Sequence, residues 1–205
     1  MKIMIERGKL IVFEGIGGCG KGTQIKMMEG WLRASGKSVL VTCEHTRDTP
    51  IGQLIERIIK KQEEGVDPVS LQLMFVADRA NHTERVIKPA LDRYDFVLAD
   101  RYEASTFSYA PIEKREYFLA VNRGVTIQPD LTCIIDLDPG EAVRRVNNRN
   151  DADIFDKVEV LGGCRKSYRW YFENSGWPCA WIDGNGSREE VFERVKTEII
   201  RRKIV

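Results

Sequence analysis

The chain has 205 residues, which is enough for one compact α/β domain with a real hydrophobic core, so we expect a single domain over residues 1–205. Its 32 lysines and arginines balance 31 aspartates and glutamates, and no apolar run approaches the length of a membrane span; we therefore expect neither a nucleic-acid nor a membrane partner. The five cysteines are widely spaced without a Cys-x-x-Cys pair, which argues against a disulfide framework and a zinc site and favours a cytoplasmic location.

A buried strand, a glycine-rich turn and the start of a helix are predicted in this order over residues 9–24. The turn has the G-x4-G-K spacing of a phosphate-binding P-loop, with Gly22 directly after Lys21 and a hydroxyl one position later at Thr23. Glycines let main-chain N–H groups point at a polyphosphate, and the helix start adds further unpaired N–H groups. A turn that only packs a helix on a strand is the alternative, and the complete spacing favours ATP binding. The predicted ATP-binding residues are Gly15, Ile16, Gly17, Gly18, Cys19, Gly20, Lys21, Gly22 and Thr23.

Short apolar, β-branched runs alternate with helical patterns along the rest of the chain. This alternation is typical of βαβ units, so we predict an α/β fold: a five-stranded parallel sheet flanked by helices, with a short lid. After the strand that precedes Gly15, further strands are expected at 38–43, 95–100, 131–138 and 179–183. Helices are expected at 24–34, 51–61, 70–93 with a bend at Pro89, 105–122 with a break at Pro111, 139–146 and 158–174, and after a capping box of Ser187 and Glu190.

The third predicted strand ends in Asp100 and Arg101, at the edge of the sheet that also carries the P-loop. An aspartate at this place is suited to orient Mg²⁺ or its waters, and an arginine is suited to clamp a phosphate. We therefore predict a magnesium site at Thr23 and Asp100, with Mg²⁺ accompanying ATP. A purely structural ion pair between Asp100 and Arg101 is the alternative.

The segment 144–153 carries a density of charged and amide side chains that cannot be buried. It is either a solvated helix end or a lid that folds its arginines over the transferring phosphates, and we assign the predicted lid to about residues 147–157. Residues 16–19 of the P-loop include no side-chain cation, so such arginines must come from the lid. Arg149 is the first choice and Arg145 the second.

Four stretches resemble the thymidylate kinases, a family of P-loop nucleoside monophosphate kinases, over nearly the whole chain. They are residues 13–24 with the P-loop, 75–82, 100–102 together with Ser105, Thr106 and Tyr109, and 129–139 ahead of the arginine-rich segment. Together these motifs are far more specific than the P-loop alone. The resemblance implies the fold of the P-loop nucleoside monophosphate kinases, transfer of the γ-phosphoryl group of ATP to dTMP, and a homodimer.

The resemblance also implies roles for residues on the acceptor side. Phe75 would stack on the acceptor base, Arg79 would hydrogen-bond its carbonyl edge, and Thr106 would stand near a ring nitrogen. Arg101 would hold the acceptor phosphate. A core position is the alternative for Phe75 taken alone. The predicted catalytic residues are Lys21, Arg101, Arg149 and Arg145, and the predicted acceptor-binding residues are Glu44, Phe75, Arg79, Arg101, Ser105, Thr106 and Tyr109.

Three positions depart from the family pattern. The P-loop residue that is usually acidic is Gly17, the usual Arg-Glu-Pro after the second strand is Cys43-Glu44-His45, and GKGT stands where GKST or GKTT is usual. Arg47 is a candidate replacement for the missing arginine, and His45 is either a ligand contact or a solvated loop residue. These departures are compatible with phosphoryl transfer but leave the identity of the preferred acceptor nucleotide undecided. The alternatives are therefore dUMP or another nucleoside monophosphate as acceptor, or a non-catalytic ATP-binding paralogue.

Overall fold

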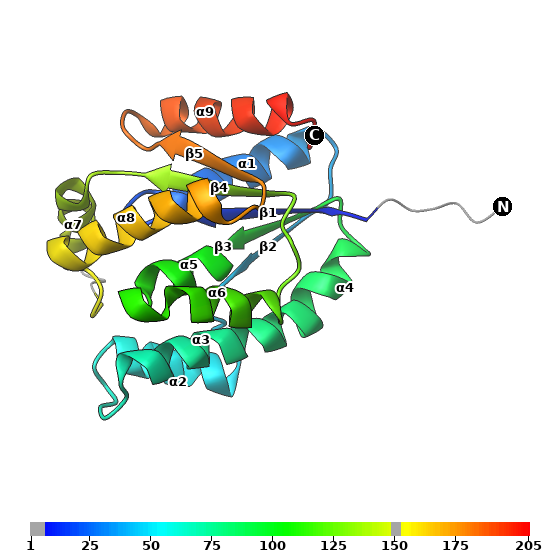
Figure 1. Ribbon diagram of the computed structural model, residues 1–205. Helices are drawn as coiled ribbons and strands as arrows, with labels where there is room; N and C mark the ends of the chain where they lie inside the picture. Colours follow the sequence, from blue (N-terminus) through cyan, green and yellow to red (C-terminus); the bar gives the residue numbers. More distant parts are fainter. Residues whose placement is uncertain (1–6, 149–152) are drawn as a thin grey trace.

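The computed structural model describes residues 7–148 and 153–205, in which five strands form one parallel sheet. The strands are β1 (Lys9–Glu14), β2 (Val39–Cys43), β3 (Phe96–Asp100), β4 (Leu131–Asp136) and β5 (Cys179–Asp183). Their order is β2-β3-β1-β4-β5, so β1 is the central strand and the strands run in one direction across Figure 1. The predicted α/β fold with a five-stranded parallel sheet is confirmed.

Helices cover both faces of the sheet (Figure 1). On one side α1 and α9 contact each other, and on the other α3, α5 and α6 contact one another. None of the described helices is long and apolar enough to cross a membrane. The helices are α1 (Lys21–Ala34), α2 (Pro50–Ile59), α3 (Pro68–His82), α4 (Lys88–Leu91), α5 (Glu103–Tyr109), α6 (Arg115–Arg123), α7 (Pro139–Asn147), α8 (Val158–Asn174) and α9 (Arg188–Arg201), with a π-helical segment η1 (Thr83–Ile87) and a 3₁₀ turn η2 (Ile112–Lys114).

Polar caps decide where several helices begin. The Asp67 carboxylate accepts hydrogen bonds from two main-chain N–H groups of the first turn of α3, and Asp138 does the same for α7. Because Asp138 serves as a cap, β4 ends at Asp136, two residues before the predicted end of the strand. The predicted capping box of Ser187 and Glu190 is present at the start of α9.

The long helical pattern after Asp67 is irregular, but not at the predicted residue. The π-helical segment η1 begins at Thr83, six residues before Pro89, and Pro89 itself lies inside α4. A proline ring crowds the carbonyl group one turn before it and offers no N–H group in return. The wider π-helical turn ahead of Pro89 relieves this crowding, so the α-helix is interrupted upstream of the proline.

The central strand β1 is buried on both faces. Leu10 and Val12 pack with α4 on one face, whereas Ile11 and Phe13 belong to the main core cluster, which also includes buried residues of α1, α8 and α9. Successive side chains of a strand point to opposite faces, so a continuous apolar run is needed where helices cover both. This packing holds the end of β1, and with it the start of the P-loop, at the middle of the sheet edge.

Candidate active site

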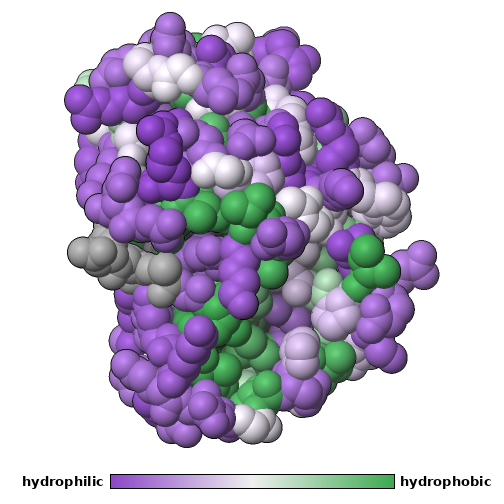
Figure 2. All heavy atoms as spheres, turned by 90° about the vertical axis from the view of Figure 1, so that its left-hand side faces the viewer, coloured by the Kyte–Doolittle hydropathy of each residue, from purple (hydrophilic) through white to green (hydrophobic). Residues whose placement is uncertain are grey.

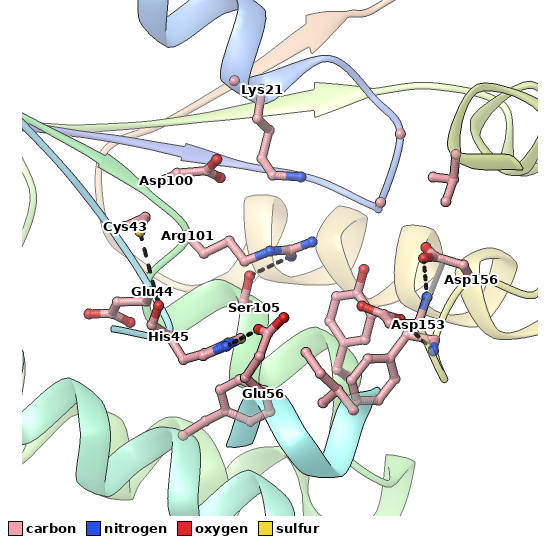
Figure 3. Close-up of a pocket in the computed structure, with 18 of the residues that line it drawn as sticks. Lys21, Cys43, Glu44, His45, Glu56, Asp100, Arg101, Ser105, Asp153 and Asp156 are labelled. Atoms are coloured by element: carbon pink, nitrogen blue, oxygen red, sulfur yellow. Dashed lines mark hydrogen bonds and ion pairs between the residues drawn. The ribbon is translucent and has the colours of Figure 1, made fainter. Parts of the chain in front are cut away.

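A cavity of about 590 Å³ opens at the carboxyl ends of the strands. This is the size range of pockets that bind small molecules. Figure 2 views this side of the molecule and shows hydrophobic side chains gathered within a largely hydrophilic surface. The walls come from the P-loop, the segment after β2, α2, α3, the start of α5 and residues 153–156 (Figure 3). Segments that are far apart in the sequence therefore meet in one chamber.

The P-loop has the backbone geometry of an anion cradle. Gly15, Gly18 and Gly20 have φ angles of +135°, +77° and +100°, a region that glycine enters most easily. Helix α1 begins at Lys21 without a side-chain cap. The N–H of Thr23 donates to the carbonyl oxygen of Gly20 at 3.0 Å, whereas the N–H groups of Lys21 and Gly22 have no partner in the described part of the chain and are available to a ligand. Six of the nine predicted ATP-binding residues line the cavity, namely Gly17, Gly18, Gly20, Lys21, Gly22 and Thr23. Gly15 does not line it, and Ile16 and Cys19 bury their side chains in the core.

Lys21 folds back on its own loop. Its Nζ donates to the carbonyl oxygens of Gly15 at 3.0 Å and Ile16 at 3.1 Å, and it approaches the Cys19 sulfur at 3.7 Å. The side chain is almost fully buried, and within the described part of the chain it is bonded only to the loop that contains it. The ammonium group is thus held beside the amides that would surround a phosphate.

Asp100 and Arg101 point into the cavity from the end of β3 (Figure 3). No ion pair joins these two side chains, which are both within the described part of the chain. The Oδ1 atom of Asp100 is buried without a hydrogen-bond partner among the described residues. Arg101 donates from Nη1 to the Ser105 hydroxyl at 3.0 Å, and its guanidinium carbon lies 5.4 Å from the Tyr109 ring centroid. Both groups are oriented toward space that a ligand can fill.

Glu14 organises this part of the site, although sequence reasoning gave it no role. Its Oε1 accepts from the main-chain N–H groups of Tyr102 at 2.7 Å and Ser105 at 3.1 Å. Its Oε2 accepts from the hydroxyl groups of Ser105 at 2.7 Å and Tyr168 at 3.0 Å. Burial raises the pKa of Glu14 above its usual value, and the bond from Ser105 opposes the rise. The available signal was a charged residue that ends an otherwise apolar strand.

The predicted acceptor residues Glu44, Arg79 and Thr106 meet in a buried network. Arg79 donates from Nε to Glu44 at 2.6 Å and from Nη1 to the Thr106 hydroxyl at 2.7 Å and to Asn122. The second Glu44 oxygen lies 3.0 Å from Nδ1 of His82. Arg79 is 1% exposed, yet both it and Glu44 line the cavity. Sequence reasoning placed His82 at the end of the family-like stretch 75–82 without a role of its own, and it gave no role to Asn122.

Phe75 and His45 form another part of the cavity wall. The ring of His45 meets the ring of Phe75 edge-on, with centroids 5.8 Å apart, and its Nε2 lies 2.7 Å from Oε2 of Glu56. The His45 side chain is only 11% exposed, so it is a wall residue rather than a solvated loop residue. Arg47, the candidate replacement arginine, also lines the cavity. Phe75 itself lines the cavity, so its ring faces the ligand space instead of lying wholly in the core.

The arginine-rich segment is only partly described. Arg149 lies outside the described residues, and the role predicted for it stays a prediction. Arg145 does not line the cavity, and its Nε donates to Glu141 at 2.7 Å. Later in the segment, Asp153, Phe155 and Asp156 do line the cavity. In Figure 3 the side chains of Asp153 and Asp156 lie on the side of the pocket opposite Asp100.

Comparison with known proteins agrees with this geometry. The family model for thymidylate kinase matches residues 13–195. A probable thymidylate kinase of Methanosarcina acetivorans is 32% identical over 201 residues, which cover 95% of this chain and 96% of that protein. A probable thymidylate kinase of Thermococcus gammatolerans is 36% identical over 171 residues, 78% of this chain and 81% of that protein.

A solved structure of thymidylate kinase from Candida albicans superposes with a TM-score of 0.78. The match covers 97% of this chain and 93% of that chain, and at 19% identity it supports the fold. The family model and the relatives extend over most of the chain. This chain belongs to the thymidylate kinase family.

Proposed function

We propose that the protein transfers the γ-phosphoryl group of ATP to dTMP and releases dTDP and ADP. An oxygen of the dTMP phosphate bonds to the γ-phosphorus while the bond from that phosphorus to the β–γ bridging oxygen breaks, and ADP leaves with that oxygen. The observation that carries the proposal is the shared cavity. Lys21 and the P-loop line its donor part, Phe75 and Arg79 line its acceptor part, and Arg101 lines it as well.

The chemistry asks the protein mainly for alignment and neutralisation. The transition state of phosphoryl transfer is loose and spreads negative charge over oxygen atoms, so positioned cations and N–H groups supply most of the catalysis. The P-loop amides and Lys21 would hold the donor phosphates, and Arg101 would clamp the acceptor phosphate. Ser105 supports Arg101 in that orientation through the hydrogen bond from Nη1.

The donor atoms at Thr23 and Asp100 fit a magnesium ion. Both residues line the cavity, and Asp100 Oδ1 is buried without a hydrogen-bond partner in the described part of the chain. Residues 7–148 and 153–205 contain no group of three His, Cys, Asp or Glu side chains that could hold a metal. A cation here would take its other ligands from water and phosphates, which is how Mg²⁺ usually binds. When bound, Mg²⁺ neutralises charge on the β- and γ-phosphates.

Acceptor recognition would rest on Phe75, Arg79 and Thr106. An aromatic face stacks on a flat base, and arginine is a donor suited to the carbonyl edge of a pyrimidine. The Glu44 and Asn122 contacts fix the Arg79 fork from behind, and Tyr109 and Ser105 would complete the acceptor wall. Arg149 remains our first candidate for the lid cation on the transferring group, with Arg145 second.

We extend the proposal to the organisation of the protein. The chain would form one domain over residues 1–205 with a lid at about 147–157, and it would work as a homodimer without nucleic acid. The five cysteines are all free in the structure, which supports a reducing, cytoplasmic environment. Sedimentation of the purified protein tests the dimer.

An acceptor panel tests the activity. ADP release is measured with ATP, Mg²⁺ and each of dTMP, dUMP, dCMP, dAMP and dGMP, and the product is identified as the diphosphate by chromatography. We expect the highest kcat/KM with dTMP. The Lys21→Ala protein, purified in the same way, controls for contaminating kinases. A preference for dUMP would favour the rival substrate, and ATP binding without turnover of any acceptor would favour a non-catalytic paralogue.

A further inference from the structure

Asp156 reaches the P-loop at a place where the loop has no side chain of its own. A Cβ atom at Gly17 would overlap Oδ1 of Asp156, and apart from the chain neighbours of Gly17 no other described residue lies within 4 Å of that position. The φ angle of Gly17 is not in the left-handed region, so its backbone conformation does not demand glycine. The carboxylate of Asp156 therefore occupies the space of the side chain that Gly17 lacks. Figure 3 shows this carboxylate turned toward the P-loop.

The turn that carries Asp156 is fixed to the body of the protein. The main-chain N–H of Ile154 donates to the carbonyl oxygen of Ile59 in α2 at 3.2 Å. The side chains of Ile154 and Phe155 pack against the apolar cluster of α2 and α3, and the Phe155 ring lies 5.0 Å from the Tyr109 ring. The N–H of Asp153 donates to Asp156 Oδ2 at 3.0 Å. These contacts hold the carboxylate in one place.

The two aspartates of the turn differ in what they offer a ligand. Asp153 Oδ1 accepts from the N–H of Phe155 at 2.7 Å, and burial raises the pKa of this carboxyl, with the charge of Asp156 adding to the rise. Asp153 therefore builds the turn. Asp156 Oδ1, in contrast, has no hydrogen-bond or ion-pair partner among residues 7–148 and 153–205. It is the acceptor atom that remains available beside the P-loop.

The chemistry of the cavity limits what Asp156 can bind. Phosphates on the P-loop amides are anions and repel a carboxylate, so the ligand group that faces Asp156 must donate a hydrogen bond. In a bound deoxynucleoside monophosphate the sugar lies between the phosphate, which Arg101 attracts, and the base, which Phe75 stacks upon. Its one free hydroxyl is the 3′-hydroxyl. We propose, resting on the proposed function, that Asp156 accepts a hydrogen bond from the 3′-hydroxyl group of the acceptor nucleotide.

The test compares two acceptors that differ only in this hydroxyl, dTMP and 2′,3′-dideoxythymidine monophosphate. For the wild-type enzyme we expect removal of the hydroxyl to lower kcat/KM by about tenfold to hundredfold, because the lost bond has a charged acceptor. Asp156→Ala should lower kcat/KM for dTMP by a similar factor and change that for the dideoxy acceptor by about twofold or less. Asp156→Asn, which keeps an acceptor oxygen without the charge, should fall between.

Two further variants separate contact from general damage. Glu159→Gln removes an exposed negative charge three residues from Asp156, at the start of α8. It should leave the ratio of kcat/KM for dTMP to that for the dideoxy acceptor unchanged. The exchange Gly17→Asp with Asp156→Gly moves the carboxylate to the P-loop side of the same space, which Gly17 can accept once Asp156 is removed. This double variant should regain part of the preference for the 3′-hydroxyl. Thermal unfolding of each variant confirms that it is folded.

The inference is overturned if the ratio of kcat/KM for dTMP to kcat/KM for the dideoxy acceptor is the same in the wild type and in Asp156→Ala, that is, if the substitution lowers both values equally. It is also overturned if extra Mg²⁺ restores the activity of Asp156→Ala. Equilibrium titration of both acceptors into wild type and Asp156→Ala gives the same comparison without turnover. If the wild type phosphorylates no monophosphate, the proposed function fails, and the titration still decides whether Asp156 contacts the hydroxyl.

Discussion

The proposed donor half of the cavity is built from main chain, whereas the proposed acceptor half is built from side chains that other side chains hold in place. The P-loop offers N–H groups and Lys21, and among the described residues Lys21 is bonded only to its own loop. On the acceptor side, Arg79 is fixed by Glu44 and Asn122, which lie 35 and 43 residues away in the sequence. A main-chain cradle needs only local glycines and a helix start. A side-chain site needs partners from several elements.

The same contrast appears in two buried glutamates, Glu14 at the end of β1 and Glu44 directly after β2. Glu14 is surrounded by neutral donors, two N–H groups and two hydroxyls. Glu44 is paired with the guanidinium of Arg79 and with the ring of His82. A buried carboxylate that accepts hydrogen bonds from neutral groups alone bears the desolvation cost of its charge, whereas removal of a paired carboxylate leaves the charge of its partner buried and uncompensated. Substitutions in the two halves should therefore have different effects on activity and stability.

Removal of the P-loop lysine should have the largest effect. Lys21→Ala should lower turnover by at least about a thousandfold, roughly 4 kcal/mol, because charge on the transferring group loses its nearest ammonium. The protein should remain folded, since the bonds of Lys21 to residues 7–148 and 153–205 go to carbonyls and a sulfur of its own loop. ADP release measures the first effect and thermal unfolding the second. A variant that unfolds, or one that retains turnover, would contradict the division between the halves.

Breaking the acceptor-half pair should act first on stability. Glu44→Ala leaves the buried Arg79 guanidinium without its partner at 2.6 Å, and we expect a loss of about 3 to 5 kcal/mol in the free energy of unfolding. Urea unfolding measures the loss. The control is Glu63→Ala, which breaks the exposed pair with Arg57 at 3.1 Å and should cost at most about 1 kcal/mol. An equal loss in the free energy of unfolding in both variants would mean that Glu44 does not stabilise the buried Arg79 guanidinium.

Arg149 tests whether a cation outside both halves completes the chemistry. Arg149→Ala should lower turnover by about a hundredfold, or about 2.7 kcal/mol, with little change in the KM for the acceptor. The control is Arg144→Ala, an exposed residue that pairs with Glu141. Turnover equal to that of the wild type would remove Arg149 from the reaction and make Arg145 the next candidate.

The smallest effect concerns the pH dependence of Glu14. Burial raises the folded-state pKa of Glu14 above the usual value of 4.5. The contribution of Glu14 to stability is therefore fully present below about pH 4.5 and is lost as pH rises through the folded-state pKa. The free energy of unfolding of wild type minus that of Glu14→Gln should fall as pH rises from 4 to 7.5. Urea unfolding across this range measures it, and a difference that is constant or rises with pH would refute the sign.

What the sequence could predict follows the same division. The P-loop, the strands and the order of the helices depend on local sequence patterns, namely glycine spacing, apolar runs and caps. They could therefore be predicted directly. The meeting of Arg79 with Asn122, of Glu14 with Tyr168, and of Asp156 with Gly17 depends on how distant elements pack. No local pattern records such contacts. The η1 segment was missed because one wider turn shifts the apolar spacing too little to stand out from that of an ordinary helix.

The bonds from Lys21 to Gly15 and Ile16 act as a cross-link within the P-loop. These bonds keep the loop in one conformation before any nucleotide binds. The binding site for ATP is therefore preorganised, and ATP binding does not have to order the loop. The ammonium group only changes partners, from carbonyl oxygens to phosphate oxygens. Association with ATP should then be governed by diffusion and charge steering, and little of the binding energy is lost to organising the loop.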